Sequence, residues 1–222
     1  DPMQIGYITF KSNKLPLRNK RIREALSYTI DRDLISRQVS FGTRAPLRAI
    51  VPPQLHKKEF SLWPKYNPNI ARTLLKKEGY CEKEILPIPL TFRSNVPADK
   101  LLALTWKDQV KRDLSDCIKI TLNGVESTTV YKQLSEGAFE AVILDWTGEY
   151  LDPKAYLTPL LSCSKINNNI CLEGEAAISG SFWGDNKVQE LLNKSEVLVG
   201  ENRLKTLIQV EELAAKASSY LP

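Results

Sequence analysis

The residue types best suited to chemistry lie in one short stretch, DWTGEYLDP at positions 145–153. This stretch directly follows the apolar run 141–144, which is typical of a buried strand. Ligands of open α/β sheets bind beyond the carboxyl ends of the strands. The stretch is therefore predicted to form a loop at the edge of a sheet where a ligand would bind.

Four side chains of this stretch could contact a ligand. Trp146 and Tyr150 offer flat apolar surface with a polar tip, and Glu149 and Asp152 offer carboxylates. Together they suit an organic cation, such as the amino terminus of a peptide. A turn whose aromatic rings seal the edge of the core, with its acids solvated, has the same composition, and composition alone favours that second interpretation.

Catalytic and metal-binding patterns are missing from the sequence. It contains no GxSxG, GxGxxG, P-loop or HExxH motif, and its only histidine is His56. The four cysteines have no CxxC spacing, which argues against a zinc site. We therefore predict a binding protein with no catalytic residues, no metal and no cofactor. An enzyme using Glu149 and Asp152 as paired carboxylates is a weaker alternative.

The composition is that of an ordinary globular protein. Of 222 residues, 42% are hydrophobic and 26% charged, with a net charge of +5. Nucleic-acid domains carry a denser basic stripe with a recognisable reading element, and neither is present. The predicted domain organisation is one α/β lobe covering residues 1–222. The chain begins at Asp1 rather than Met, which indicates a processed or excised chain.

Alternating and helical spacings predict a βαβαβ core with helices around it. Such an order predicts parallel pairing through crossover helices, within a mixed sheet that also contains a strand at 4–10. Pro87 and Pro89 place the first core strand at an edge of the sheet. The predicted core elements are strands at 86–92, 118–122 and 139–144 and helices around 103–114 and 130–134.

Outside this core the sequence predicts further helices with identifiable caps. Asn19, Asp31, Asn67 and Asp185 each precede an apolar helical pattern, as N-cap residues do. A long ordered loop is predicted from Ser40 to Pro64, and a polar surface excursion from Ser162 to Trp183. Two more helices are predicted at 154–161 and 204–217.

The four cysteines admit three full pairings. Cys81 and Cys117 precede the first and second core strands, at the same end of the predicted sheet, so a disulfide between them is one hypothesis. A second hypothesis is a disulfide that closes the loop from Cys163 to Cys171. Unpaired buried thiols are the alternative.

Several segments, in order along the chain, resemble the family 5 extracellular solute-binding proteins, the dipeptide, oligopeptide and nickel receptors of ABC importers. The similar segments are LPLRNKRIREALSYTIDRDLI (15–35), YNPNIARTLLKKEGY (66–80), GAFEAVILDWTGEYLDP (137–153) and, more weakly, 202–222. The resemblance implies one lobe of a two-lobe type II periplasmic-binding-protein fold. In that fold a larger lobe precedes this span and receives the chain again after it, and ligand is enclosed as the lobes close. Such a lobe alone is expected to bind weakly or undetectably.

The resemblance also implies roles for individual residues. Trp146 matches a Trp that lines the family's cleft, and Glu149 lies where peptide binders carry the Asp that pairs with the ligand's ammonium group. Tyr150 and Asp152 match the family motif as well, and Tyr7 lies near cleft residues on the first strand. Oligopeptide binders often have a cleft arginine on the third core strand, where this chain has Val142, Ile143 and Leu144, and Lys11 replaces a usual Asn.

The function implied is the substrate-binding component of an ABC importer, which takes up a peptide or similar small solute. Its partners would be the ligand, the importer permease subunits and the larger lobe, with no nucleic acid. Its location would be periplasmic or extracellular, with or without a lipid anchor. The alternative is the small-molecule-sensing domain of a cytoplasmic DNA-binding transcriptional regulator, because the same domain occurs there.

Overall fold

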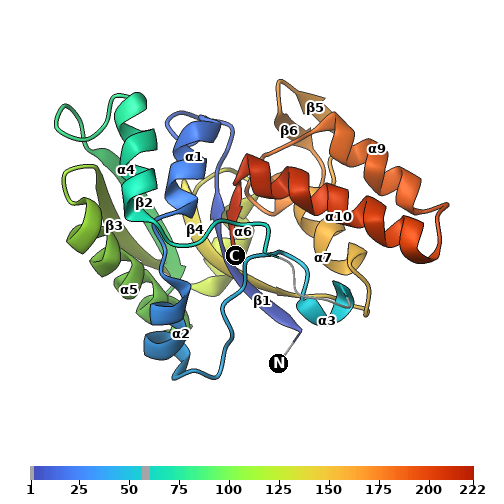
Figure 1. The fold of residues 1–222 in the computed structure, drawn as a ribbon, viewed down its shortest axis with the longest axis horizontal. Coiled ribbons are helices and arrows are strands. Elements are labelled where there is room, and N and C mark those ends of the chain that lie inside the picture. Colours follow the sequence, from blue (N-terminus) through green and yellow to red (C-terminus); the bar gives the residue numbers. More distant parts are fainter. Residues whose placement is uncertain (1–2, 57–60) are drawn as a thin grey trace.

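A mixed five-stranded sheet forms the centre of the protein (Figure 1). The structure, a computed structural model, describes residues 3–56 and 61–222. The strand order is β3-β2-β4-β1-β7, and a separate hairpin pairs β5 with β6. The strands are β1 (Gln4–Phe10), β2 (Leu86–Arg93), β3 (Ile118–Val125), β4 (Ala141–Thr147), β5 (Lys165–Asn167), β6 (Ile170–Glu173) and β7 (Tyr220–Leu221).

Helices surround this sheet, and the predicted caps begin four of them. The side chains of Asn19, Asp31, Asn67 and Asp185 each accept a hydrogen bond from a backbone N–H in the first turn. The helices are α1 (Lys20–Ser27), α2 (Arg32–Ser40), α3 (Pro53–His56), α4 (Pro68–Lys77), α5 (Pro97–Leu114), α6 (Ser127–Leu134), α7 (Lys154–Leu161), α8 (Glu175–Ile178), α9 (Asn186–Ser195) and α10 (Gly200–Ala217). No helix in the described part of the chain is long and apolar enough to cross a membrane.

The predicted parallel core is confirmed. β2 pairs in parallel with β3 along its whole length and with β4 at Leu90 and Thr91. The carboxyl ends of the three strands therefore meet at one edge of the sheet. β4 begins at Ala141 and continues to Thr147, so Asp145 and Trp146 belong to the strand and not to the loop predicted for them.

The predicted edge position of β2 is wrong, because β2 lies between β3 and β4. The Leu86 N–H donates to the Cys117 carbonyl, so the amide positions of Pro87 and Pro89 face the other way, toward β4. β4 joins the ladder only from Ala141, opposite Leu90. Both prolines thus precede the residues of β2 that pair with β4, so their missing N–H groups leave no hydrogen bond to β4 unmade.

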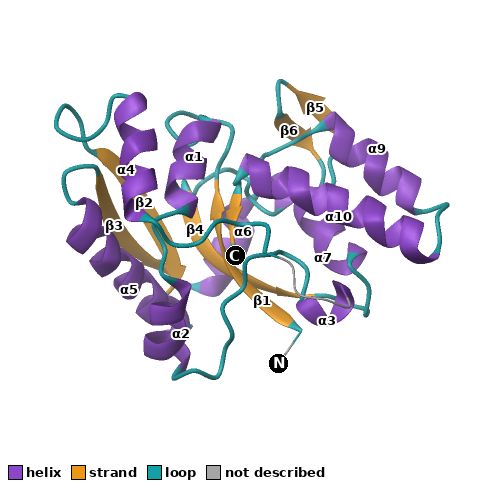
Figure 2. Cartoon of the chain, in the orientation of Figure 1, coloured by secondary structure: helices purple, strands orange, loops and turns teal. Residues whose placement is uncertain are grey.

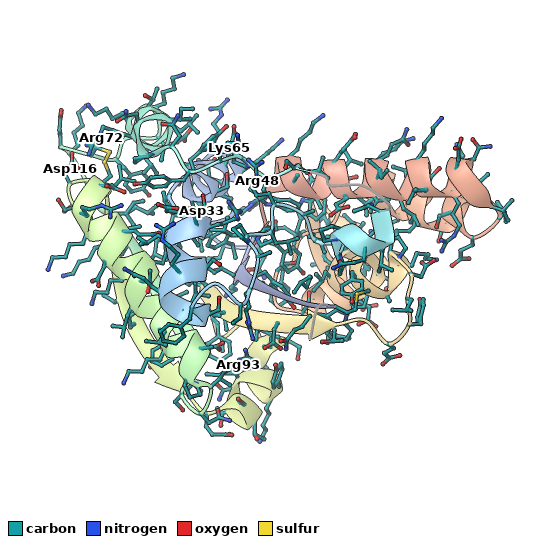
Figure 3. The ribbon with its side chains drawn as sticks, turned by 60° about the horizontal axis from the view of Figure 1, so that its bottom comes forward. Asp33, Arg48, Lys65, Arg72, Arg93 and Asp116 are labelled. Carbon is teal, nitrogen blue, oxygen red and sulfur yellow. A yellow bond between two sulfur atoms is a disulfide. The ribbon has the colours of Figure 1, made fainter. Side chains whose placement is uncertain are left out.

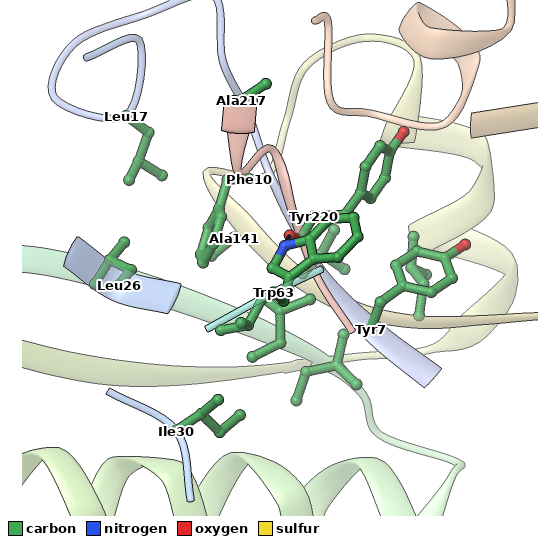
Figure 4. Packing of buried hydrophobic residues seen from close by; sticks show 14 of the residues in the cluster. Tyr7, Phe10, Leu17, Leu26, Ile30, Trp63, Ala141, Ala217 and Tyr220 are labelled. Carbon is green, nitrogen blue, oxygen red and sulfur yellow. Dashed lines mark hydrogen bonds between the residues drawn. The ribbon is translucent and has the colours of Figure 1, made fainter. Parts of the chain in front are cut away.

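β1 and β7 extend the sheet by antiparallel pairing, β1 with β4 and β7 with β1. β1 pairs with β4 over seven residues, from Gln4 opposite Thr147 to Phe10 opposite Ala141. Tyr220 of β7 packs edge-on against Tyr7, with ring centroids 5.6 Å apart, and its carbonyl accepts a hydrogen bond from Trp63 Nε1 at 2.8 Å (Figure 4). The long loop from Ser40 therefore packs into the core, although its residues 57–60 lie outside the described part of the chain.

The helices form two groups (Figure 2). In the first, α5 packs against β2 and β3, and α2 and α4 pack against α5. In the second, α9 lies along α10, which also contacts α7. The region predicted as a polar excursion, Ser162 to Trp183, contains the β5–β6 hairpin and α8.

Both disulfide hypotheses are confirmed. Cys81 bonds to Cys117, which joins the segment after α4 to the start of β3, and Cys163 bonds to Cys171 within the hairpin region. The first closes a separation of 36 residues and the second one of only 8. Chain-entropy arguments predict greater stabilisation from the longer closure.

We predict that removing the two bonds separately will have unequal effects. Cys81→Ala/Cys117→Ala should lower the free energy of unfolding by about 4 kcal/mol, and Cys163→Ala/Cys171→Ala by about 2.5 kcal/mol. Urea unfolding of the two variants measures the difference. A larger loss of unfolding free energy in Cys163→Ala/Cys171→Ala than in Cys81→Ala/Cys117→Ala would contradict this prediction.

Candidate functional site

The edge of the sheet where β2 and β4 end carries a buried charge cluster. Arg93 is the last residue of β2 and is 5% exposed. Its Nε and Nη2 donate to the two carboxylate oxygens of Asp99 at 2.7 and 2.9 Å, and Nη2 also donates to Asp145 of β4 at 2.9 Å. Nη1 donates to the Tyr131 hydroxyl at 2.9 Å. One guanidinium thus ties the ends of two parallel strands to the first turn of α5.

Figure 3 shows Arg93 at the end of the molecule away from Arg72 and Asp116. Burial by itself would lower the pKa of Arg93, but the hydrogen bonds and charges of Asp99 and Asp145 outweigh burial and raise it above its ordinary value. The cluster itself holds two carboxylates for one guanidinium, and Arg32 and Arg44 add positive charge around the adjoining cavity.

A cavity of about 630 Å³ adjoins this cluster. Asp99 and Asp145 line part of it, and the start of β1, helix α2 and the segment 43–47 enclose it. Arg32 also lines it. Its Nε donates to the Pro222 carbonyl and its Nη1 to the Pro64 carbonyl, whereas its buried Nη2 has no hydrogen-bond partner in the described structure. The cavity therefore offers both acidic groups and a spare guanidinium donor.

Tyr7 is the predicted site residue that lines this cavity. Its side chain is buried, and its ring packs against that of Tyr220. Burial raises the pKa of Tyr7 well above its usual value, and the neighbouring Tyr220 contributes in the same direction. Tyr7 is therefore a neutral phenol at physiological pH, able to donate or accept a hydrogen bond.

Trp146 lies outside the cavity lining. It is half-buried against the core, and its Nε1 donates to the Ala155 carbonyl of α7 at 2.8 Å. The indole thus holds the end of β4 against α7. Gly148 continues this close packing, since a Cβ atom there would lie 2.7 Å from Tyr156 Cε2.

Glu149 and Tyr150 lie on the surface of the loop that follows. Tyr150 is 56% exposed and Leu151 78%. Glu149 is exposed and forms no hydrogen bond or ion pair with any described residue. Its carboxylate is available to a ligand or to a second protein surface.

Asp152, the last predicted site residue, is engaged within the protein. Its two oxygens accept hydrogen bonds from Arg203 Nη2 and Nη1 at 2.8 and 2.7 Å, and Oδ1 also accepts from the Lys154 N–H. Burial acts to raise the pKa of Asp152, but the hydrogen bonds from Arg203 and Lys154 prevail, so its pKa lies below the ordinary value. This ion pair fastens the loop to α10.

The structure therefore separates the predicted site residues into two groups. Tyr7 lines the cavity, whereas Trp146 lies at the end of β4 against α7, and Glu149, Tyr150 and Asp152 lie in the loop that follows. Sequence reasoning missed Arg93, Asp99 and Arg32. A basic residue immediately after an alternating apolar strand, with an acid six positions on, was the one local indication of the Arg93–Asp99 pair.

Among residues 3–56 and 61–222, no three His, Cys, Asp or Glu side chains gather as they would around a metal ion. The arrangement at this edge is thus one of charged, phenolic and apolar groups that can bind a solute by hydrogen bonds and charge.

The chain belongs to the bacterial extracellular solute-binding proteins of family 5, because the model of that family's middle region matches residues 1–168. This is a family of solute-binding proteins and not of enzymes. The fold matches part of the type II periplasmic binding protein structures.

Individual relatives give the extent of the likeness. Heme-binding protein A of Haemophilus influenzae is 27% identical over 228 residues, which cover 99% of this chain and 39% of that protein. The dipeptide-binding protein of Escherichia coli is 25% identical over 167 residues, covering 73% of this chain and 30% of that one. The solved murein tripeptide-binding protein of Escherichia coli superposes with a TM-score of 0.84 at 21% identity, covering 99% of this chain and 42% of its own. The chain spans less than half the length of each.

We predict that Arg93→Met will destabilise the protein by about 3–5 kcal/mol, because it leaves the buried Asp99 without its counter-charge. Asp145→Asn should cost about 1 kcal/mol or less, since Asp145 is 28% exposed and the pair is partly solvated. Urea unfolding compares the two. Equal losses of unfolding free energy in the two variants would contradict the greater contribution assigned to the Arg93–Asp99 pair.

The Arg203–Asp152 pair predicts a pH dependence. Because the pKa of Asp152 is lowered in the folded state, its contribution is complete above the unfolded pKa and is lost as the pH falls through the folded pKa. Asp152→Asn should therefore be less stable than wild type at neutral pH. That difference should shrink as the pH falls below 3.8, the ordinary value. Thermal unfolding across this range measures the gap, and a gap that stays constant would refute the prediction.

Proposed function

We propose that this chain is one lobe of a two-lobe receptor that delivers a solute to an ABC importer. Its ligand-facing surface is the edge of the sheet where β2 and β4 end, together with the loop that carries Glu149. Family membership supports the class of protein, and the parallel β3-β2-β4 core supports the position of the surface. The larger lobe and the permease subunits are the expected partners.

The ligand we propose is a peptide or a similar small solute with a positively charged amino group. The observation that carries this proposal is the exposed carboxylate of Glu149, which forms no ion pair with a described residue and lies in the loop directly after β4. A carboxylate and an ammonium group form a strong charge-assisted hydrogen bond when a closing lobe excludes water. Trp146 fixes the loop that presents Glu149, and Tyr7 supplies a hydroxyl from the cavity.

The proposed location is outside the cytoplasm, in the periplasm or at the cell surface. Two disulfides support it, since such bonds persist in oxidising compartments and are rare in the cytosol. The relatives include periplasmic proteins, among them an oligopeptide-binding protein of Escherichia coli. The disulfides disfavour the alternative of a sensing domain in a cytoplasmic regulator.

The test uses the full-length protein that contains this chain. Glu149→Gln should weaken binding of a dipeptide with a free amino terminus by about tenfold or more, because a charged partner is lost. Binding of the same dipeptide with an acetylated amino terminus should be equally weak in wild type and variant. Isothermal titration calorimetry measures all four affinities.

Glu196→Gln is the matched control. It removes another exposed carboxylate, one that pairs with Lys154 on α7, and should leave the affinity unchanged. If Glu149→Gln leaves the affinity for the free peptide unchanged, Glu149 does not meet the ammonium group. If the full-length protein binds neither peptide, the proposed ligand class is wrong.

A further inference from the structure

A second cavity, of about 370 Å³, lies at the opposite end of the sheet from the proposed ligand surface. It begins at Ser12, just beyond the end of β1 that pairs with the start of β4. Helix α1, the tip of the β5–β6 hairpin and the last turn of α10 form its other walls. These elements meet near the top of Figure 1. The proposed solute surface, at the other end of β4, does not account for it.

The charged residues that line this cavity are mainly basic. Arg18, Lys20 and Lys216 are exposed side chains around it, and none forms an ion pair with a described residue. Asp185 is the one acid among the described lining residues, and its carboxylate already caps α9 by accepting the Val188 N–H at 3.0 Å. Four basic side chains against one carboxylate leave the described lining with a surplus of positive charge.

Arg23 gives the cavity a buried cation. It is 4% exposed, yet its only acceptors in the described structure are backbone carbonyls. Nε donates to Ala217, and Nη1 donates to Leu17 and Arg18, all at 2.9–3.0 Å. Nη2 donates to no described residue. Burial without a carboxylate partner lowers the pKa of Arg23 to about 10.

Those three carbonyls explain part of the Arg23 geometry, because a cation near Ala217 also favours the C-terminal end of α10. Nη2 bonds to none of them and is not fully buried, so it remains accessible as a donor at the cavity. A buried charge is stable when it is paired as well as hydrogen-bonded. The spare donor and the three unpaired basic side chains line one cavity, in which Asp185 is the single acid among the described lining residues.

We propose that this cavity binds a small oxyanion, a phosphate or carboxylate group. Nη2 of Arg23 holds it from within, and the three exposed basic side chains close around it. A planar guanidinium matches the geometry of either group and gives strong charge-assisted hydrogen bonds. The site is independent of the solute surface and does not rest on the proposed function.

The probe is inorganic phosphate, added to the protein against chloride at equal ionic strength. Phosphate should raise the thermal unfolding temperature and shift the side-chain nitrogen resonances of Arg23 in nuclear magnetic resonance spectra. Arg18→Ala/Lys216→Ala should lower the phosphate affinity by about tenfold or more, since two charged contacts are lost. Both side chains are exposed, so this variant should fold even if substitution of Arg23 does not.

Lys111→Ala/Lys119→Ala is the matched control, because it removes the same charge from exposed positions on α5 and β3. It should bind phosphate as wild type does. Equal losses in both double variants would show a nonspecific charge effect and overturn the proposal. The proposal would also be overturned if phosphate changed neither the Arg23 resonances nor the unfolding temperature of the wild-type protein.

A second arm separates two sources of such a group, a lipid headgroup and a free anion. Wild type and the Arg18→Ala/Lys216→Ala variant are sedimented with vesicles of phosphatidylglycerol and phosphatidylcholine. Sedimentation of wild type alone supports the site and assigns the headgroup as its ligand. A phosphate response without sedimentation supports the site and assigns a free anion.

Discussion

The edge of the sheet where β2 and β4 end, which we propose faces the ligand, depends on the pairing of Arg93 with Asp99 and Asp145. Parallel strands bring their carboxyl ends to one edge, but β2 and β4 pair directly at only two positions. The Arg93 guanidinium joins the two strand ends beyond that short ladder and ties both to α5. The geometry of the edge is thus fixed by one charge network, in which a single guanidinium holds two carboxylates.

The loop after β4 is held by a separate set of contacts. Trp146 donates to α7, Gly148 lets the backbone lie against Tyr156, and Asp152 pairs with Arg203 of α10. With its two ends fixed in this way, the loop presents Glu149 to the outside. A rigid frame that carries one unengaged charge is suited to binding, since little order is lost when a ligand arrives.

Local sequence patterns predicted the elements well, and non-local contacts explain what they missed. The N-caps at Asn19 and Asp31 could be predicted from local sequence because each side chain accepts a hydrogen bond from a backbone N–H within three residues. The edge position inferred from Pro87 and Pro89 was wrong, because it depends on where a strand more than fifty residues later joins the ladder. The role of Arg93 was not predicted for the same reason, since its partner Asp145 lies 52 residues away in the sequence. The resemblance to family 5, carried by four ordered segments, supplied the class that periodicity alone could not.

The central claim is that a solute binds at the carboxyl end of β4. Hydrogen exchange measured by mass spectrometry on the full-length protein, with and without a bound dipeptide, tests it most directly. The account predicts ligand-induced protection within this chain at residues 145–151 and at the start of β1. Protection absent from those residues, or confined to the opposite end of the sheet around Ser12 and Arg23, would contradict it.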